Sequence, residues 1–193
     1  CATTQTGAGS LQWAAGAIGD GSSDLSAFVE AAMTVSAADD DLFFLPYLIG
    51  ERTPWWDPHA SGVFVGMRMQ HRREHLARAV LEGVGYALAL CQQPLRPSGT
   101  DTPIDVIGGG AASDTWLALL ADIWGAPVRR RSVTTQANSL GAAVTGLVGL
   151  GEADFGIATT LSRIEAEFAP GERAAAQPAH LRRYADAYLA LRE

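Results

Sequence analysis

The sequence has few cysteines, no long apolar run and an excess of acidic over basic residues. Only Cys1 and Cys91 are cysteines among 193 residues, so we expect no disulfide framework and a reducing compartment, the cytoplasm. No apolar run approaches the about 20 residues of a membrane helix, and no secretory signal is recognisable, so no membrane partner is expected. The formal net charge of −7 argues against nucleic acid as the main ligand.

Helices and strands are expected to alternate along the chain. Short apolar runs, including "LFFLPYL", "GVFVGM", "IDVIG" and "APVRRR", are typical of strands. The strand–helix–strand–helix order over residues 104–149 indicates a parallel sheet. We therefore expect an α/β fold with a mostly parallel sheet flanked by helices. Helical spacing of apolar residues predicts helices over residues 8–18, 24–34, 74–92, 113–124, 138–149 and 178–191.

The most informative segment is "VIGGGAASDTWLALLADIWGAPV", residues 106–128, in which a strand runs into three glycines and then a helix. Ligands of such sheets bind where strands end and helix N-termini point. Without Cβ atoms at Gly109 and Gly110, a flat group could lie against the main chain. The free N–H groups of the next helix would favour a polar or anionic partner. The alternative is a tight turn that only packs under a neighbouring element.

Two familiar glycine loops do not fit this segment. In the dinucleotide pattern G-x-G-x-x-G, Ser113 stands in place of the third glycine. The Lys-Ser/Thr pair of a P-loop is absent, and no lysine stands at a glycine-rich turn. A phosphate-gripping loop of either kind is therefore not expected here.

Two metal motifs compete with this interpretation. "HRREH", from His71 to His75, matches the zinc-protease pattern H-x-x-E-H with Glu74 as base, and Glu152 is the candidate third ligand. Two arginines add positive charge beside the histidines, and His and Glu are ordinary capping residues at a helix start, so no metal site is expected. "DGSSD" at 20–24 resembles the start of a calcium loop but lacks its later glycine and glutamate.

Together these segments resemble the C-terminal half of FGGY-family carbohydrate kinases, from about residue 5 to residue 190. "GVFVGMRMQHRREHLARAVLEG" is similar to the family's second signature at every constrained position, from Gly62 to Glu82. The glycine segment resembles the family's adenosine motif, and "FLPYLIGERTP" is similar to the corresponding loop of xylulokinases. Similar kinases often carry His-x-x-x-His-Leu without any metal, which further disfavours a protease.

The resemblance implies the actin/hexokinase ATPase fold, with residues 1–193 forming one ribonuclease-H-like domain, the nucleotide-binding half. Asp114 stands where some members carry Asn, and Gln12 matches a nucleotide-contacting position of glycerol kinase, although Ala8 departs from the glycine beside it. The ATP-binding residues that the resemblance implies are Gln12, Gly109, Gly110, Ala111, Asp114 and Asn138.

The reaction implied is transfer of the γ-phosphoryl group of ATP, with Mg²⁺, to a sugar hydroxyl. D-xylulose, giving xylulose 5-phosphate, is the expected substrate. Gluconate, or a non-catalytic nucleotide- or partner-binding module of actin-like fold, are the alternatives. The family's general-base aspartate, phosphate loops and sugar-binding residues lie upstream of "CATTQTGAGS", which lacks an initiator methionine. We therefore expect a chain without the N-terminal sugar-binding domain, without a catalytic residue or metal ligand, and inactive alone.

The expected partners are ATP or ADP, and the sugar through the missing domain; a homodimer is left open. One loop, "ERTPWWDP", would lie near the interdomain cleft according to the resemblance. From the residues themselves, Trp55 and Trp56 are expected to pack the loop against the protein, and Glu51–Arg52 to cap or brace it.

Overall fold

A computed structural model of the chain describes residues 2–19, 25–96 and 102–192. The strands are β1 (Phe43–Pro46), β2 (Gly62–Val65), β3 (Ile104–Val106), β4 (Val128–Arg131) and β5 (Ile164–Phe168). The helices are α1 (Gly9–Ile18), α2 (Leu25–Ala32), α3 (Arg73–Gln92), α4 (Asp114–Trp124), α5 (Ala137–Gly149), α6 (Ile157–Leu161) and α7 (Gln177–Arg192). Short 3₁₀ helices are η1 (Ala38–Asp40), η2 (Gln93–Leu95), η3 (Gly109–Ala112) and η4 (Glu172–Ala176). The predicted helices are confirmed in position, whereas β5 and α6 were not anticipated.

The strands form two small sheets rather than one mostly parallel sheet. β1 pairs antiparallel with β2. β3 pairs in parallel with β4, and β4 pairs antiparallel with β5. The α/β class is therefore confirmed, but the expected mostly parallel sheet is wrong for the described residues. Only β3 and β4 pair in parallel among the described strands, because the chain passes through α5 and α6 before it returns in β5 antiparallel to β4, and β1 and β2 are antiparallel as well.

Helix α3 is the centre of the core and is buried nearly all round, as its apolar pattern predicts. It packs against β1, α1, α2 and α4. Close approach depends on two glycines, since a Cβ at Gly83 would lie 2.0 Å from the Phe44 carbonyl oxygen, and one at Gly85 would lie 2.6 Å from Cδ1 of Ile123. The helix therefore holds α1, α2 and α4 together, and the N-terminal parts of these three helices lie around the glycine turn, residues 108–110.

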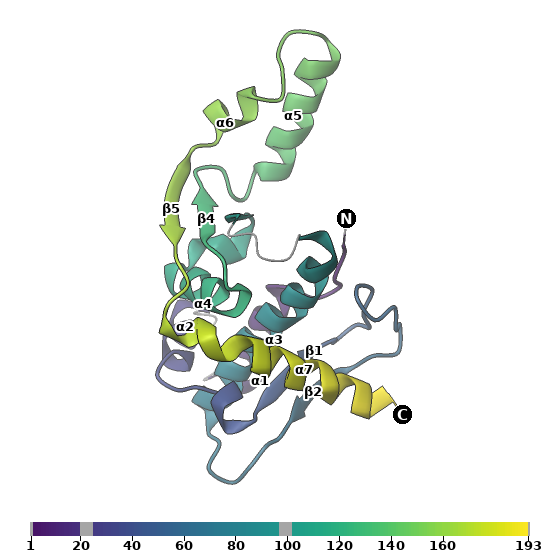
Figure 1. Cartoon of the computed structure of the whole chain (residues 1–193), viewed down its shortest axis with the longest axis vertical. Coiled ribbons are helices and arrows are strands. Elements are labelled where there is room, and N and C mark those ends of the chain that lie inside the picture. The colour runs from purple at the N-terminus through teal and green to yellow at the C-terminus, as the bar shows by residue number, and fades with distance from the viewer. Residues whose placement is uncertain (1, 20–24, 97–101, 193) are drawn as a thin grey trace.

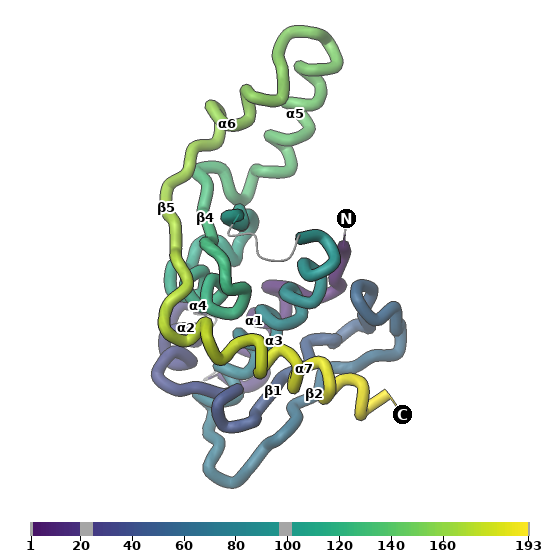
Figure 2. The backbone as a smooth tube through the Cα atoms, in the orientation of Figure 1, coloured from purple at the N-terminus to yellow at the C-terminus, as the bar shows by residue number. Residues whose placement is uncertain are grey.

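Helices α5 and α6 project away from this core as an arm, joined to it by β4 and β5 (Figures 1 and 2). The only buried residue of α5 is Val144, and Leu150 and Phe155 are exposed. At the opposite side, α7 lies across the core and inserts Tyr184 and Tyr188 into it. Among the described residues, none of the helices combines the length and apolar character needed to cross a membrane.

Candidate nucleotide site

A pocket of about 390 Å³ lies where α1, α2, η3 and the start of α4 meet. Four of the six predicted ATP-binding residues line it: Gln12, Gly109, Gly110 and Asp114. The other lining residues are Ala8, Leu11, Leu25, Ser26, Val29, Glu30, Ala112, Ser113, Thr115 and Trp116. Segments separated by about a hundred residues in the sequence thus converge on the glycine turn.

The three glycines of the turn differ in what they contact. Gly108 has a φ of +88°, a conformation that favours glycine, and its N–H donates to the Thr134 carbonyl. A Cβ at Gly109 would meet no atom within 4 Å, so this residue leaves open space over the backbone. A Cβ at Gly110 would lie 2.3 Å from Cζ3 of Trp116. We expected both Gly109 and Gly110 to leave the backbone open to a ligand. This expectation is corrected at Gly110, because the Trp116 ring already occupies the space that a Cβ would take.

The two remaining predicted residues do not line the pocket. Ala111 is completely buried beneath the turn, where its carbonyl accepts a hydrogen bond from Arg130. Asn138 is exposed near the start of α5 and does not belong to the pocket lining. The pocket therefore lends no support to Asn138 as a nucleotide contact.

The polar lining of the pocket consists of hydrogen-bond acceptors and neutral groups. Glu30 of α2 and Asp114 of α4 contribute two carboxylates. Among the lining residues that the structure describes, none is an arginine or a lysine. Arg130 lies just outside and pairs with the Asp114 carboxylate. The Ser113 hydroxyl is the predicted N-cap of α4, accepting from the Trp116 N–H at 3.2 Å.

The histidines of "HRREH" serve the start of α3. His71 Nδ1 accepts the Arg68 N–H at 3.0 Å, and His75 Nδ1 accepts the Arg72 N–H at 3.2 Å as part of a capping box. Their interpretation as capping residues is confirmed. Within the described ranges, no group of three or more His, Cys, Asp or Glu side chains is placed to hold a metal. The "DGSSD" segment at 20–24 and Cys1 lie outside the described residues.

The "ERTPWWDP" loop is held by one of its tryptophans only. Trp55 stacks on Tyr188 with ring centroids 4.3 Å apart and donates its indole N–H to the Tyr47 hydroxyl at 2.7 Å. Trp56 is 73% exposed, so the expectation that it packs the loop is wrong. Glu51 is buried and braces the loop as expected, accepting from the Thr4 hydroxyl and from the N–H groups of Gln5 and Arg52.

Tyrosine hydroxyls connect this loop to α7. The Tyr47 and Tyr184 hydroxyls lie 3.0 Å apart, and the Tyr188 hydroxyl donates to Asp57 at 2.9 Å. Burial raises the pKa of Tyr47 to about 12 and, together with the Asp57 hydrogen bond, that of Tyr188 to about 12. The backbone N–H of His59 and the Tyr188 hydroxyl lower the pKa of Asp57. These groups fix the loop and do not line the glycine-turn pocket.

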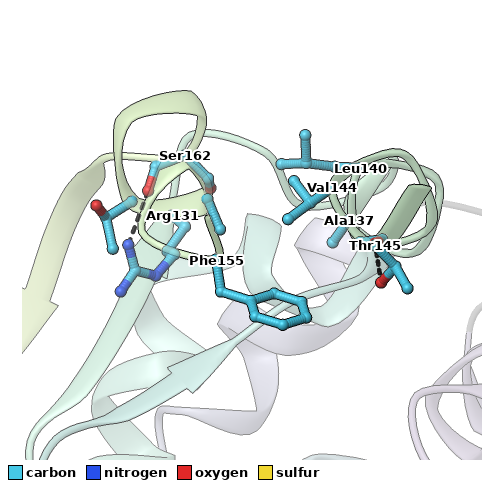
Figure 3. Close-up of a pocket in the computed structure, with 10 residues that line it drawn as sticks. Arg131, Ala137, Leu140, Val144, Thr145, Phe155 and Ser162 are labelled. Carbon is cyan, nitrogen blue, oxygen red and sulfur yellow. Dashed lines mark hydrogen bonds between the residues drawn. The ribbon is translucent and has the colours of Figure 1, made fainter. Parts of the chain in front are cut away.

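A second pocket, of about 420 Å³, lies between β4 and the arm and is lined mainly by apolar residues of α5 and α6 (Figure 3). Its one charged lining residue, Arg131, donates to the Ser162 carbonyl at 2.7 Å. It contains none of the predicted site residues, so the pocket at the glycine turn is the candidate functional site.

Residues 4–150 match the model of the FGGY family of carbohydrate kinases, C-terminal domain. The chain belongs to this family, and its fold is that of the actin/hexokinase ATPases. The resemblance of the sequence to this family is thereby confirmed.

Among individual relatives, the chain is similar to xylulose kinase of Escherichia coli (strain K12), with 44% identity over 134 residues, covering 69% of this chain and 27% of the relative. It is 38% identical over 125 residues to gluconokinase of Bacillus subtilis (strain 168), covering 64% of this chain and 24% of that one. The crystal structure of ligand-bound xylulose kinase from Lactobacillus acidophilus superimposes with a TM-score of 0.87 at 29% identity, over 97% of this chain and 39% of that one. The chain thus spans about a quarter of the length of these curated relatives.

Proposed function

We propose that the chain, residues 1–193, is the C-terminal domain of an ATP-dependent carbohydrate kinase and binds the adenosine part of the nucleotide. The observation that carries this proposal is the convergence of Gln12, Gly109 and Asp114 on one pocket, with open space over Gly109. Its volume of about 390 Å³ lies within the about 300–1,000 Å³ of small-molecule sites.

Each lining group has a use that fits a nucleoside. The bare backbone at Gly109 lets a flat ring approach the main chain. The Gln12 amide both donates and accepts hydrogen bonds, whereas the carboxylates of Glu30 and Asp114 only accept them. The ribose hydroxyls and the amino group of adenine are donors, so this lining is complementary to adenosine.

The described residues of the pocket fit the nucleoside rather than the phosphates or Mg²⁺. They include no cation and no group of three metal-ligating side chains. ATP, when bound, supplies the phosphoryl group for an in-line transfer that depends on positioning and on charge neutralisation. In a longer protein, we propose the phosphate loops, the general-base aspartate and the sugar-binding residues upstream of these 193 residues. The chain alone would then bind nucleotide without phosphorylating a sugar.

For the sugar, we propose D-xylulose, supported by the 44% identity to a xylulose kinase. Gluconate is the second candidate, supported by the 38% identity to a gluconokinase. We also propose a cytoplasmic location for such a kinase. In a longer protein that contains these residues, an ADP-release assay with each sugar decides between the two substrates. A higher kcat/KM for gluconate would overturn the xylulose proposal.

The nucleoside function is tested on the chain itself by ligand-observed NMR with ADP, which detects affinities in the millimolar range. We expect weak ADP binding, because phosphate contacts are few, and full competition by adenosine. Ribose 5-phosphate should not compete. If ribose 5-phosphate displaced ADP as well as adenosine did, the site would recognise phosphate rather than nucleoside. If ADP did not bind at all, the proposal would fail.

A further inference from the structure

Strand β4 carries three consecutive arginines, and they do not face the same partners. Arg129 and Arg131 both pair with Asp105 of β3, at 3.0 Å to Oδ1 and 2.7 Å to Oδ2. Successive side chains of a strand point to opposite faces. The middle residue, Arg130, accordingly contacts a different set of groups, which belong to the glycine turn and to β5.

The Arg130 guanidinium links the glycine turn to the first residue of α4. Its Nη1 donates to the Asp114 carboxylate and, at 3.4 Å, to the Ala111 carbonyl. Its Nε lies 3.9 Å from a Glu165 carboxylate oxygen on β5. The Arg130 side chain is only 21% exposed, whereas that of Asp114 is 64% exposed. A largely buried cation therefore holds a carboxylate that faces the solvent-accessible pocket.

We propose that Arg130 is a positioning residue for the nucleoside pocket, fixing the Asp114 carboxylate as an acceptor for the 6-amino group of adenine. This inference rests on the proposed function and names a residue and a base preference within it. An unpaired carboxylate on an exposed helix start would sample several rotamers, and ordering it would weaken binding. Pairing with Arg130 restricts Asp114 before the ligand arrives.

Base preference follows from the chemistry of the acceptor. A carboxylate accepts from the 6-amino group of adenine, whereas the 6-oxo group of hypoxanthine is itself an acceptor and donates no hydrogen bond to the carboxylate. Glu30, the other carboxylate of the lining, adds a second acceptor and no donor. The pocket is therefore expected to bind ADP about 10-fold more tightly than IDP, on the scale of one lost hydrogen bond to a charged group.

The test is a pair of ligand-observed NMR titrations, with ADP and with IDP, of the 193-residue chain and four variants. Arg130→Gln should weaken ADP binding by about 3- to 10-fold and bring the ADP/IDP affinity ratio toward one. Arg130→Lys should recover part of both, since it keeps the cation. Asp114→Asn should lower the ratio by itself, and its effect should not add to that of Arg130→Gln. Arg129→Gln, on the same strand but paired with Asp105, should change neither affinity nor ratio.

The outcomes distinguish a failure of the positioning role of Arg130 from a failure of the proposed nucleotide binding. If the parent chain binds ADP and Arg130→Gln matches Arg129→Gln, the positioning role is wrong. It is also wrong if Arg130→Gln weakens ADP and IDP equally and additively with Asp114→Asn, because a merely structural residue would act in that way. If Arg130→Gln does not fold, Arg130→Lys and Asp114→Asn decide by the ratio alone. Absence of ADP binding by the folded parent overturns the proposed function, and this inference with it.

Discussion

Gly110 backs onto Trp116 so closely that a Cβ at this glycine would lie 2.3 Å from Cζ3 of the indole. Trp116 is itself buried and lines the pocket from the side of α4. Gly109, one residue earlier, has open space where its Cβ would be. The glycine turn therefore has a packing position and an open position side by side, and substitutions at the two should have separable effects.

Gly110→Ala should destabilise the fold, because the new methyl group must displace Trp116 from its packed position. The expected loss is about 1–3 kcal/mol in the free energy of unfolding, the usual cost of overpacking. Gly109→Ala should change stability by no more than about 0.5 kcal/mol. Urea unfolding followed by circular dichroism measures both. Equal losses at the two positions would contradict the packing assigned to Gly110.

The buried ion pair of α3 gives a second test. Arg78 and Glu82 are almost fully buried, with Nε and Oε1 2.6 Å apart, and Glu82 also accepts the Ala38 N–H. Arg78→Met should cost about 3–5 kcal/mol, since it leaves a buried carboxylate uncompensated. Adding Glu82→Gln should recover much of this loss.

The control for this pair is Arg68→Met, which removes one member of the exposed Arg68–Asp41 pair. Exposed pairs contribute about 0–1 kcal/mol, so little change is expected. Chemical unfolding measures all of these variants. If Arg78→Met lowered the free energy of unfolding no more than Arg68→Met does, burial of the Arg78–Glu82 pair would not determine its contribution to stability.

The tyrosines predict how stability depends on alkaline pH. All four tyrosines of the chain have a raised pKa, with burial as the main cause, and the pKa of Tyr47 and of Tyr188 reaches about 12. In the unfolded chain they ionise near pH 10. The folded state therefore holds more protons between about pH 10 and 12, and stability falls as pH rises through this window.

Absorbance at 295 nm, which reports tyrosinate, measures this directly. At pH 10 we expect little tyrosinate, and on further increase its appearance together with the loss of helical circular dichroism. A chain unfolded in urea should titrate near pH 10 and serves as the control. Half-ionisation of the tyrosines at pH 10 in the folded protein would show that their hydroxyls are not buried as described.

Much of this arrangement could be predicted from the sequence, for identifiable physical reasons. Apolar residues on all faces of α3 predict a helix that is buried nearly all round. Ser113, which follows the glycines, predicts the N-cap of α4. The resemblance to the adenosine motif predicts Gly109 and Asp114 as pocket residues. The match to a nucleotide-contacting position of glycerol kinase predicts Gln12, although α1 is about a hundred residues from the glycine turn in the sequence.

Most of what was missed depends on how side chains pack in the folded chain. Strand β5 alternates as "IEAEF", a period-two pattern in which the glutamates lie on the exposed face, and no strand was expected there. The reason for Gly110 depends on where the Trp116 ring lies, and the contrast between Trp55 and Trp56 depends on Tyr188 from α7. The contacts of Gly110 with Trp116 and of Trp55 with Tyr188 leave no local signal in the sequence.

The most direct test of the nucleoside pocket is ADP binding by Gly109→Val, compared with the parent chain and with Gly146→Val. Gly146 lies exposed on α5, has equally open space for a Cβ, and is outside the pocket. We expect Gly109→Val to lose ADP binding while keeping the parent's unfolding midpoint, and Gly146→Val to bind ADP as the parent does. Undiminished binding by a folded Gly109→Val would show that adenosine does not lie on the glycine turn.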